Sequence, residues 1–152
     1  MLSSRLLAGA PLLIAVLAAP HACASDFDFR TVGNGSAILH ETPSSKGKKL
    51  YMAPPGMPLQ VMIAYGDWVK VRDMNGAVAW TQVRALVPRR NVLVRTPGAG
   101  VYSGPDESSA VLMTADKGVL LELVDPNALV WARVRHRDGV VGYIKVSDIW
   151  GL

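Results

Sequence analysis

Few side chains in this sequence have the chemistry that catalysis needs. Nucleophilic catalysis uses a Ser, Cys or Thr beside a base that a third group orients, and a protein metal site needs three or four converging ligands. The only cysteine is Cys23, and residues 25–152 hold two histidines, His40 and His136. Because both histidines adjoin turn-forming residues, we expect them to be exposed. The sequence therefore predicts no catalytic residue, no metal and no cofactor.

Methionine is a second residue type with ligand chemistry, since its thioether sulfur is a soft ligand for copper. The methionines are irregularly spaced, and some fall in apolar segments. Filling of the core is the preferred interpretation, because Met adapts to irregular gaps. The five methionines concerned are Met52, Met57, Met62, Met74 and Met113.

Aromatic residues are better candidates for binding. In an extended chain, successive side chains point to opposite faces, so Trp68 and Trp131 lie opposite the residues that follow them, Val69 and Ala132. The face with these small apolar residues is expected to be the core. Both tryptophans then lean outward, each toward a loop that contains a proline.

The candidate ligand surface lies between that loop and that tryptophan. Flat aromatic faces beside a proline bury area at low entropic cost, which suits short peptides or sugars. The second set is favoured because it has two aromatics, and the alternative is that both tryptophans only close the end of the fold. The candidate residues are Tyr102, Pro105 and Trp131 in one set and His40, Pro43 and Trp68 in the other.

These two sets exist because the chain contains a repeat. The segment 68–80 aligns with 131–143, which lies 63 residues later, and upstream of it the spacing is 62. Self-similarity at a fixed spacing indicates two copies of one structural unit. We place the two units at residues 29–88 and 91–152.

Each unit is predicted to be β-sheet. Asn75-Gly76 and Asp138-Gly139 are hairpin signals, because a type I′ turn needs positive φ at both central residues. Alternating or β-branched residues flank both pairs, and no helical apolar stripe extends over ten residues. Five short strands in each unit would form a closed or nearly closed small barrel, filled by side chains and without an internal pocket.

The resemblance to a known family is carried by Gly66-Asp67-Trp68-Val-Lys-Val-Arg, Asn75-Gly76 and Ala79-Trp80. This pattern resembles the bacterial SH3 (SH3b) pattern, and it extends over residues 29–152. The resemblance implies an all-β chain of two tandem SH3-like small β-barrels, which binds cell-wall peptides or partner proteins without catalysis. The second copy repeats the pattern with Trp131, Val134, Gly139 and Gly142-Tyr143.

The chain departs from that family at two places. His40 and Tyr102 stand where the family's opening motif usually has Arg, so a ligand that depends on that Arg is not implied. The first copy has Ala79 where the second has Gly142. The residues with which eukaryotic SH3 domains complete their proline-peptide groove have no clear counterparts here.

Residues 1–24 have the layout of a cleaved signal peptide. Arg5 precedes an apolar run over 6–17, and Ala22-Cys23-Ala24 forms an A-x-A site before Ser25. The run is too short to span a bilayer. We therefore expect a periplasmic or secreted protein without membrane insertion after cleavage. A lipidated Cys23 is the alternative, which the preceding Pro20-His21-Ala22 fits poorly.

The net charge gives no indication of nucleic-acid binding. The net charge is only +4, the basic residues are scattered, and no nucleic-acid motif occurs. The leading hypothesis is an exported, non-catalytic module of the cell envelope that binds cell-wall peptide, peptidoglycan or a periplasmic protein. The alternative is a structural or regulatory accessory protein that partners a sensor or a wall hydrolase without binding the wall. The sequence names neither the ligand nor the oligomeric state.

Overall fold

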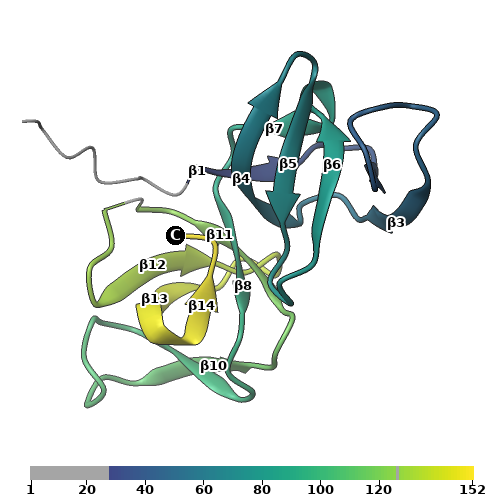
Figure 1. Ribbon diagram of the computed structural model, residues 1–152. Helices are drawn as coiled ribbons and strands as arrows, with labels where there is room; N and C mark the ends of the chain where they lie inside the picture. The colour runs from purple at the N-terminus through teal and green to yellow at the C-terminus, as the bar shows by residue number, and fades with distance from the viewer. Residues whose placement is uncertain (1–27, 126) are drawn as a thin grey trace, which may run out of the picture.

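The computed structural model describes residues 28–125 and 127–152, and these form two antiparallel sheets of seven strands (Figure 1). The prediction of an all-β chain with two tandem SH3-like units is confirmed. The expected signal peptide, residues 1–24, lies outside the described residues, as does its cleavage site.

The first sheet has the strand order β3-β2-β6-β5-β4-β1-β7. Each short strand pairs with its neighbours in antiparallel register, and a 3-10 helix, η1, precedes the last strand. The elements are β1 (Asp28–Val32), β2 (Ala37–His40), β3 (Lys49–Ala53), β4 (Pro58–Tyr65), β5 (Trp68–Arg72), β6 (Val78–Gln82), η1 (Val83–Ala85) and β7 (Leu86–Val87).

The second sheet repeats the first in the order β10-β9-β13-β12-β11-β8-β14. The repeat extends to the register, because Trp80 lies opposite His40 in one sheet and Tyr143 opposite Tyr102 in the other. The elements are β8 (Asn91–Val94), β9 (Ala99–Tyr102), β10 (Val111–Ala115), β11 (Leu120–Leu123), β12 (Trp131–Arg135), β13 (Val141–Lys145), η2 (Val146–Asp148) and β14 (Ile149–Trp150).

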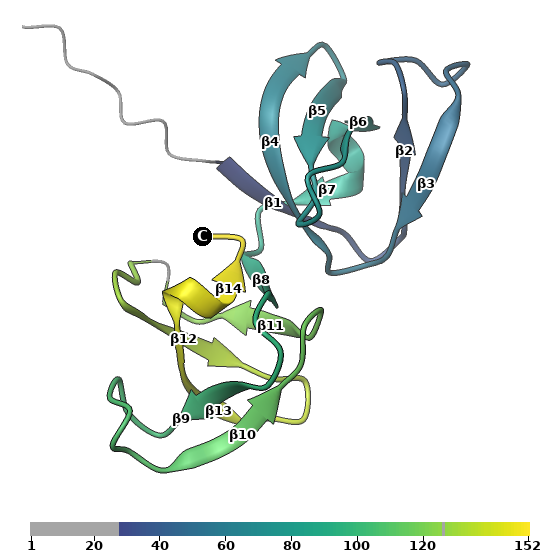
Figure 2. The ribbon, with the colours of Figure 1, turned by 60° about the horizontal axis from the view of Figure 1, so that its bottom comes forward.

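Each sheet has two more strands than the five that the sequence predicts. One of the two extra strands in each sheet is β7 or β14, which has two residues and is too short to leave a periodic pattern. The strands β7 and β14 pair with β1 and β8, and these pairings extend each sheet as it curls into a barrel (Figure 2).

Each barrel has a core of its own. As predicted, Val69 and Val71 face inward in the first barrel, and Ala132 and Val134 do so in the second. The prediction that methionines fill the core is wrong for Met52 and Met62, whose exposed fractions are 64% and 40%.

Both hairpin turns differ from the predicted type I′ turn. Gly76 and Gly139 have φ of 87° and 91°, but no other residue type has positive φ among the described residues. In the first turn the N–H of Gly76 donates to the carbonyl of Asp73, and the N–H of Asp73 donates to Ala77. The loop therefore has three residues, a type I turn followed by a glycine in the left-handed region.

Contacts between the barrels surround the link from β7 to β8. The ring of Phe29 meets that of Trp150 edge to face, with centroids 4.9 Å apart. The buried Asn91 side chain donates from Nδ2 to the carbonyl of Gly56, at 2.9 Å. The hydroxyl of Thr31 donates to the carbonyl of Arg89. These contacts give the two barrels a shared boundary with both apolar and polar parts.

Candidate functional site

In each barrel, the tryptophan that begins the first strand of the hairpin contacts an aromatic ring two strands away in the sheet. Trp68 of β5 contacts His40 of β2, and Trp131 of β12 contacts Tyr102 of β9. The rings of His40 and Trp68 have centroids 5.2 Å apart and lie at 89°. The rings of Tyr102 and Trp131 lie 5.4 Å apart at 83°. Edge-to-face contact is a favourable arrangement for such rings. The structure thus brings together two of the three predicted site residues in each barrel.

His40 is buried, with 6% of its surface exposed, so the prediction that it is exposed is wrong. The loop 41–48 folds back over the ring, and the N–H of Glu41 donates to the carbonyl of Lys48. The Nδ1 atom of His40 lies 3.2 Å from the carbonyl oxygen of Gly47, to which it donates. His40 is therefore oriented on one side by backbone and on the other by Trp68.

Gly47 permits this close approach of the loop. A Cβ at this position would lie 2.3 Å from the hydroxyl oxygen of Thr42, which is far inside van der Waals contact. The loop residue that reaches the site is Ser45. Pro43 lies in this loop and Pro105 in the equivalent loop of the second barrel. Pro43 is not among the residues that line the hollow beside Trp68.

His136 also departs from the prediction of exposure. Only 14% of its side chain is exposed, and its Nδ1 lies 3.2 Å from an Oδ atom of Asp138. The imidazole is folded against its own hairpin turn, which follows the strand that Trp131 begins. We assign it a role in the turn.

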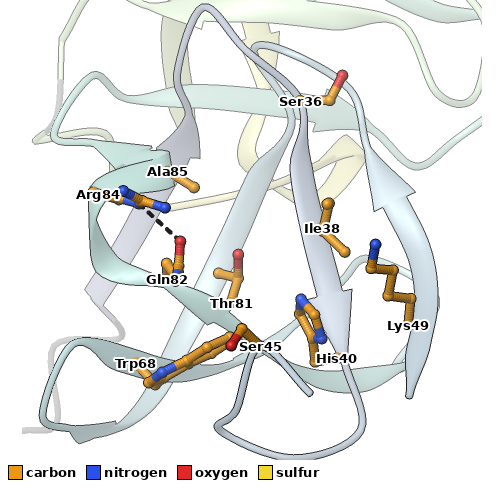
Figure 3. Close-up of a pocket in the computed structure, with 10 residues that line it drawn as sticks. All are labelled: Ser36, Ile38, His40, Ser45, Lys49, Trp68, Thr81, Gln82, Arg84 and Ala85. Carbon is orange, nitrogen blue, oxygen red and sulfur yellow. Dashed lines mark hydrogen bonds between the residues drawn. The ribbon is translucent and has the colours of Figure 1, made fainter. Parts of the chain in front are cut away.

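A hollow of about 510 Å³ opens beside His40 and Trp68 in the first barrel (Figure 3). Its walls come from β2, β3, β5, the loop 41–48 and the end of β6 with η1. The lining combines an apolar part, a set of neutral polar groups and two cations. The apolar residues are Ile38, Trp68 and Ala85, the neutral polar residues are Ser36, Ser45, Thr81 and Gln82, and the cations are Lys49 and Arg84, beside His40.

Lys49, Gln82 and Arg84 were not predicted from the sequence. The Nε atom of Arg84 donates to the Oε1 atom of Gln82 at 2.8 Å, which sets the plane of the guanidinium (Figure 3). The signal that could have found them is the alignment of the two copies. Lys49 and Arg84 align with Val111 and Ser147, so the copies differ in charge at both positions.

The equivalent place in the second barrel is crossed by an ion pair. Lys145, which aligns with Gln82, forms a salt bridge with Glu107, which aligns with Ser45. The hydrogen bond to Glu107 raises the pKa of Lys145. The Nζ atom of Lys145 also lies 6.0 Å from the ring centroid of Trp131, a cation–π distance. The geometry thus favours the first barrel as the ligand surface, whereas the sequence favoured the second.

Two further observations concern the part of the chain that the structure describes, residues 28–125 and 127–152. No group of three His, Cys, Asp or Glu side chains there is placed to hold a metal ion. No helix in those ranges is long and apolar enough to cross a membrane.

Comparison with solved structures finds similar chains at low sequence identity. NlpC1 from Trichomonas vaginalis is 12% identical with a TM-score of 0.40, and the match covers 94% of this chain and 52% of that one. For NlpC2 from the same organism the values are 14%, 0.37, 82% and 48%. For an NlpC/P60 family protein from Bacillus cereus ATCC 10987 they are 18%, 0.37, 80% and 55%. This chain spans about half the length of these solved chains.

The family is shown by the sequence itself. No curated protein matches the chain. Residues 34–87 and residues 96–151 each match the bacterial SH3 domain. Together the two matches cover well over half of the chain, and they correspond to the two barrels that carry the Trp68 and Trp131 ring pairs. The chain belongs to the bacterial SH3 domain family, whose domain it contains twice in tandem.

Proposed function

We propose that this protein is an exported, non-catalytic binding module of the cell envelope, which holds a cell-wall peptide or a segment of a periplasmic protein in the hollow of its first barrel. The observation that carries the proposal is the hollow beside Trp68 and His40. Membership of the bacterial SH3 family and the signal-like residues 1–24 support a place in the envelope.

The size and lining of the hollow suit a short peptide. Its volume of about 510 Å³ lies within the range of small-ligand sites. Trp68 offers a flat apolar face, and aromatic anchors of this kind dominate many interfaces. Ser45 and Gln82 offer hydrogen-bonding groups beside it, which match the amide groups of a peptide backbone.

A binding role fits the chemistry of the lining better than catalysis. The lining residues contain no carboxylate and no thiol. The Nδ1 atom of the one lining imidazole, His40, donates to the carbonyl of Gly47. The lining thus provides contact area and hydrogen bonds. A hydroxyl nucleophile needs a base that a third group, such as a carboxylate, holds in place, and the lining contains no such carboxylate.

Binding to purified peptidoglycan sacculi tests the proposal. The exported protein should sediment with sacculi, and Trp68→Ala should weaken binding about tenfold or more, as loss of an aromatic anchor does. Trp131→Ala is the matched control, because it removes the equivalent ring from the other barrel. Melting temperatures of both variants are measured alongside, and Ser45→Glu serves as an exposed variant of the hollow that leaves Trp68 in place.

The outcomes separate the two sources of ligand. Sedimentation that depends on Trp68 identifies the wall as the ligand. Capture of a periplasmic protein that depends on Trp68, without sedimentation, identifies a protein partner. Sedimentation that survives both Trp68→Ala and Ser45→Glu in folded protein would overturn the assignment of the hollow.

Export is part of the same proposal. Secretion with cleavage after Ala24 would leave Ser25 as the first residue. Mass spectrometry of the protein from a periplasmic or culture fraction checks this, and a lipid on Cys23 would contradict it.

A further inference from the structure

The hollow of the first barrel is lined by positively charged residues and by no negatively charged one. The charged residues in its lining are Lys49 and Arg84, both cationic. The ion pairs found among residues 28–125 and 127–152 include neither of them. Two cations without acidic partners at one hollow create a positive potential that attracts an anion.

The guanidinium of Arg84 is oriented before a ligand arrives. Its Nε atom already donates to Gln82 Oε1 at 2.8 Å. Its two Nη atoms have no hydrogen-bond or ion-pair partner among residues 28–125 and 127–152, and this planar fork matches the two oxygens of a carboxylate. Lys49 lies on the opposite wall, on β3, with His40 and Thr81 between the two cations (Figure 3).

The second barrel shows that this charge is specific to the first. Lys49 aligns with Val111 and Arg84 with Ser147, so neither cation has a counterpart. The lysine near Trp131, Lys145, is neutralised by Glu107. The positive hollow therefore reflects the particular residues of the first barrel and does not follow from the mild net charge of +4.

We infer that the hollow of the first barrel selects a short peptide segment that carries a carboxylate, bound by Arg84 within the positive field to which Lys49 contributes, while apolar parts of the peptide pack on Trp68. The inference rests on the proposed function and names the ligand chemistry of that site. The carboxylate can belong to a wall peptide or to an acidic segment of a protein.

Matched probes that differ in one carboxylate test this inference. The probes are acetyl-Ala-Glu-Ala-amide against acetyl-Ala-Gln-Ala-amide, and acetyl-Ala-Ala with a free carboxylate against its amide. Calorimetry or tryptophan fluorescence should show each acidic probe binding about tenfold more tightly than its neutral partner, the size expected for a charge-assisted hydrogen-bonded pair. The preference should vanish in Arg84→Gln, shrink in Lys49→Gln, and fall as salt rises. Arg89→Gln, an exposed cation outside this hollow, should leave it unchanged.

A parallel arm uses native sacculi and sacculi whose carboxylates have been converted to amides. A loss of binding on amidation, together with loss in Arg84→Gln, would place the carboxylate on the wall. A preference for the acidic probes without any binding to sacculi would place it on a protein.

Three results would overturn the inference. Wild-type protein that binds native and amidated sacculi equally, with Arg84→Gln and Lys49→Gln unchanged, would leave the proposed function standing and remove the carboxylate. Competition by inorganic phosphate at concentrations where acetate has no effect would assign the cations to a phosphate ligand instead. Absence of binding to sacculi, to periplasmic proteins and to every probe would remove the proposed function itself and the inference with it.

Discussion

The two barrels share their strand order and their aromatic ring pair and differ where a ligand would sit. The pairing of His40 with Trp80 in one barrel recurs as that of Tyr102 with Tyr143 in the other. In the first barrel Ser45 and Gln82 border an open hollow, whereas Glu107 and Lys145 at the aligned positions form an ion pair. One framework thus presents two surfaces of different chemistry, and the difference depends on a few exposed side chains that the core does not constrain.

The hairpin turns show a second difference. In the first barrel the buried carboxylate of Asp73 accepts hydrogen bonds from the N–H groups of Asn75 and Ala77 and from the hydroxyl of Tyr51, all at 2.9 Å. In the second barrel His136 occupies the aligned position, and its Nδ1 atom pairs with Asp138 of its own turn. The first turn is therefore tied to β3 through Tyr51, and the second has no such link through His136.

The largest expected effect is the loss of Asp73. Asp73→Ala should destabilise the protein by about 3 kcal/mol, because three donors lose a charged acceptor in a buried site. His136→Ala, at the aligned position, should cost about 1 kcal/mol. Urea unfolding of both variants measures the difference, and equal costs would mean that the two turns are supported in the same way.

The glycines of the two turns should respond alike. Gly76→Val and Gly139→Val should each cost on the order of 1–3 kcal/mol, because a β-branched residue at positive φ is strained. Neither site has an atom within 4 Å of an added Cβ, so the cost comes from the backbone alone. Thermal melts of the two variants test this, and unchanged melting in both would contradict the turn assignment.

Exchange of two side chains should convert one surface into the other. Ser45→Glu with Gln82→Lys introduces the residues of the second barrel into the first, and we expect it to lower ligand binding about tenfold, since the ion pair would cross the hollow. Stability should change by less than about 0.5 kcal/mol because both positions are surface sites. Sedimentation with sacculi and thermal melts measure the two effects. The reverse exchange, Glu107→Ser with Lys145→Gln, is the control, and it should leave binding to the first barrel intact.

The smallest effect concerns the pH dependence of the link through Tyr51. Burial, with the hydrogen bond to Asp73, raises the pKa of Tyr51 above its ordinary value. The neutral phenol is favoured in the folded state, so its contribution to stability is complete below about pH 10, the ordinary tyrosine pKa, and is lost as the pH rises above that value. Wild-type protein should exceed Tyr51→Phe in stability by about 1 kcal/mol at pH 8. The difference should shrink above pH 10, and urea unfolding at pH 8 and pH 11 compares the two. A difference that grows with pH would contradict the assignment.

Most of the fold could be predicted from the sequence because the repeat makes each copy a test of the other. The aligned Trp68 and Trp131 predicted two like units, and the valine or alanine that follows each predicted the face that forms the core. The strands β7 and β14 escaped prediction because two residues carry no periodicity. The turn type was also missed, since a glycine at positive φ is compatible with both a two-residue and a three-residue loop.

The candidate site was only partly predictable. The ring pairs follow from strand register, so His40 with Trp68 and Tyr102 with Trp131 could be named in advance. The cations could not, because Lys49 and Arg84 belong to β3 and η1, and nothing local indicates that both border one hollow. The preference for the second barrel failed for the same reason, since the pairing of Lys145 with Glu107 spans 38 residues of sequence.

The sequence by itself determined the class of fold, the doubling of the unit and the aromatic residues at the candidate surface, because these depend on alternation, spacing and repetition along the chain. Only the tertiary structure decided that His40 is buried, that the first barrel carries the hollow, and that its two cations form no ion pair among the described residues 28–125 and 127–152. These properties arise where the loop 41–48 folds back over β2 and where β3 and η1 border one hollow, and contacts between segments far apart in sequence are set by packing in three dimensions.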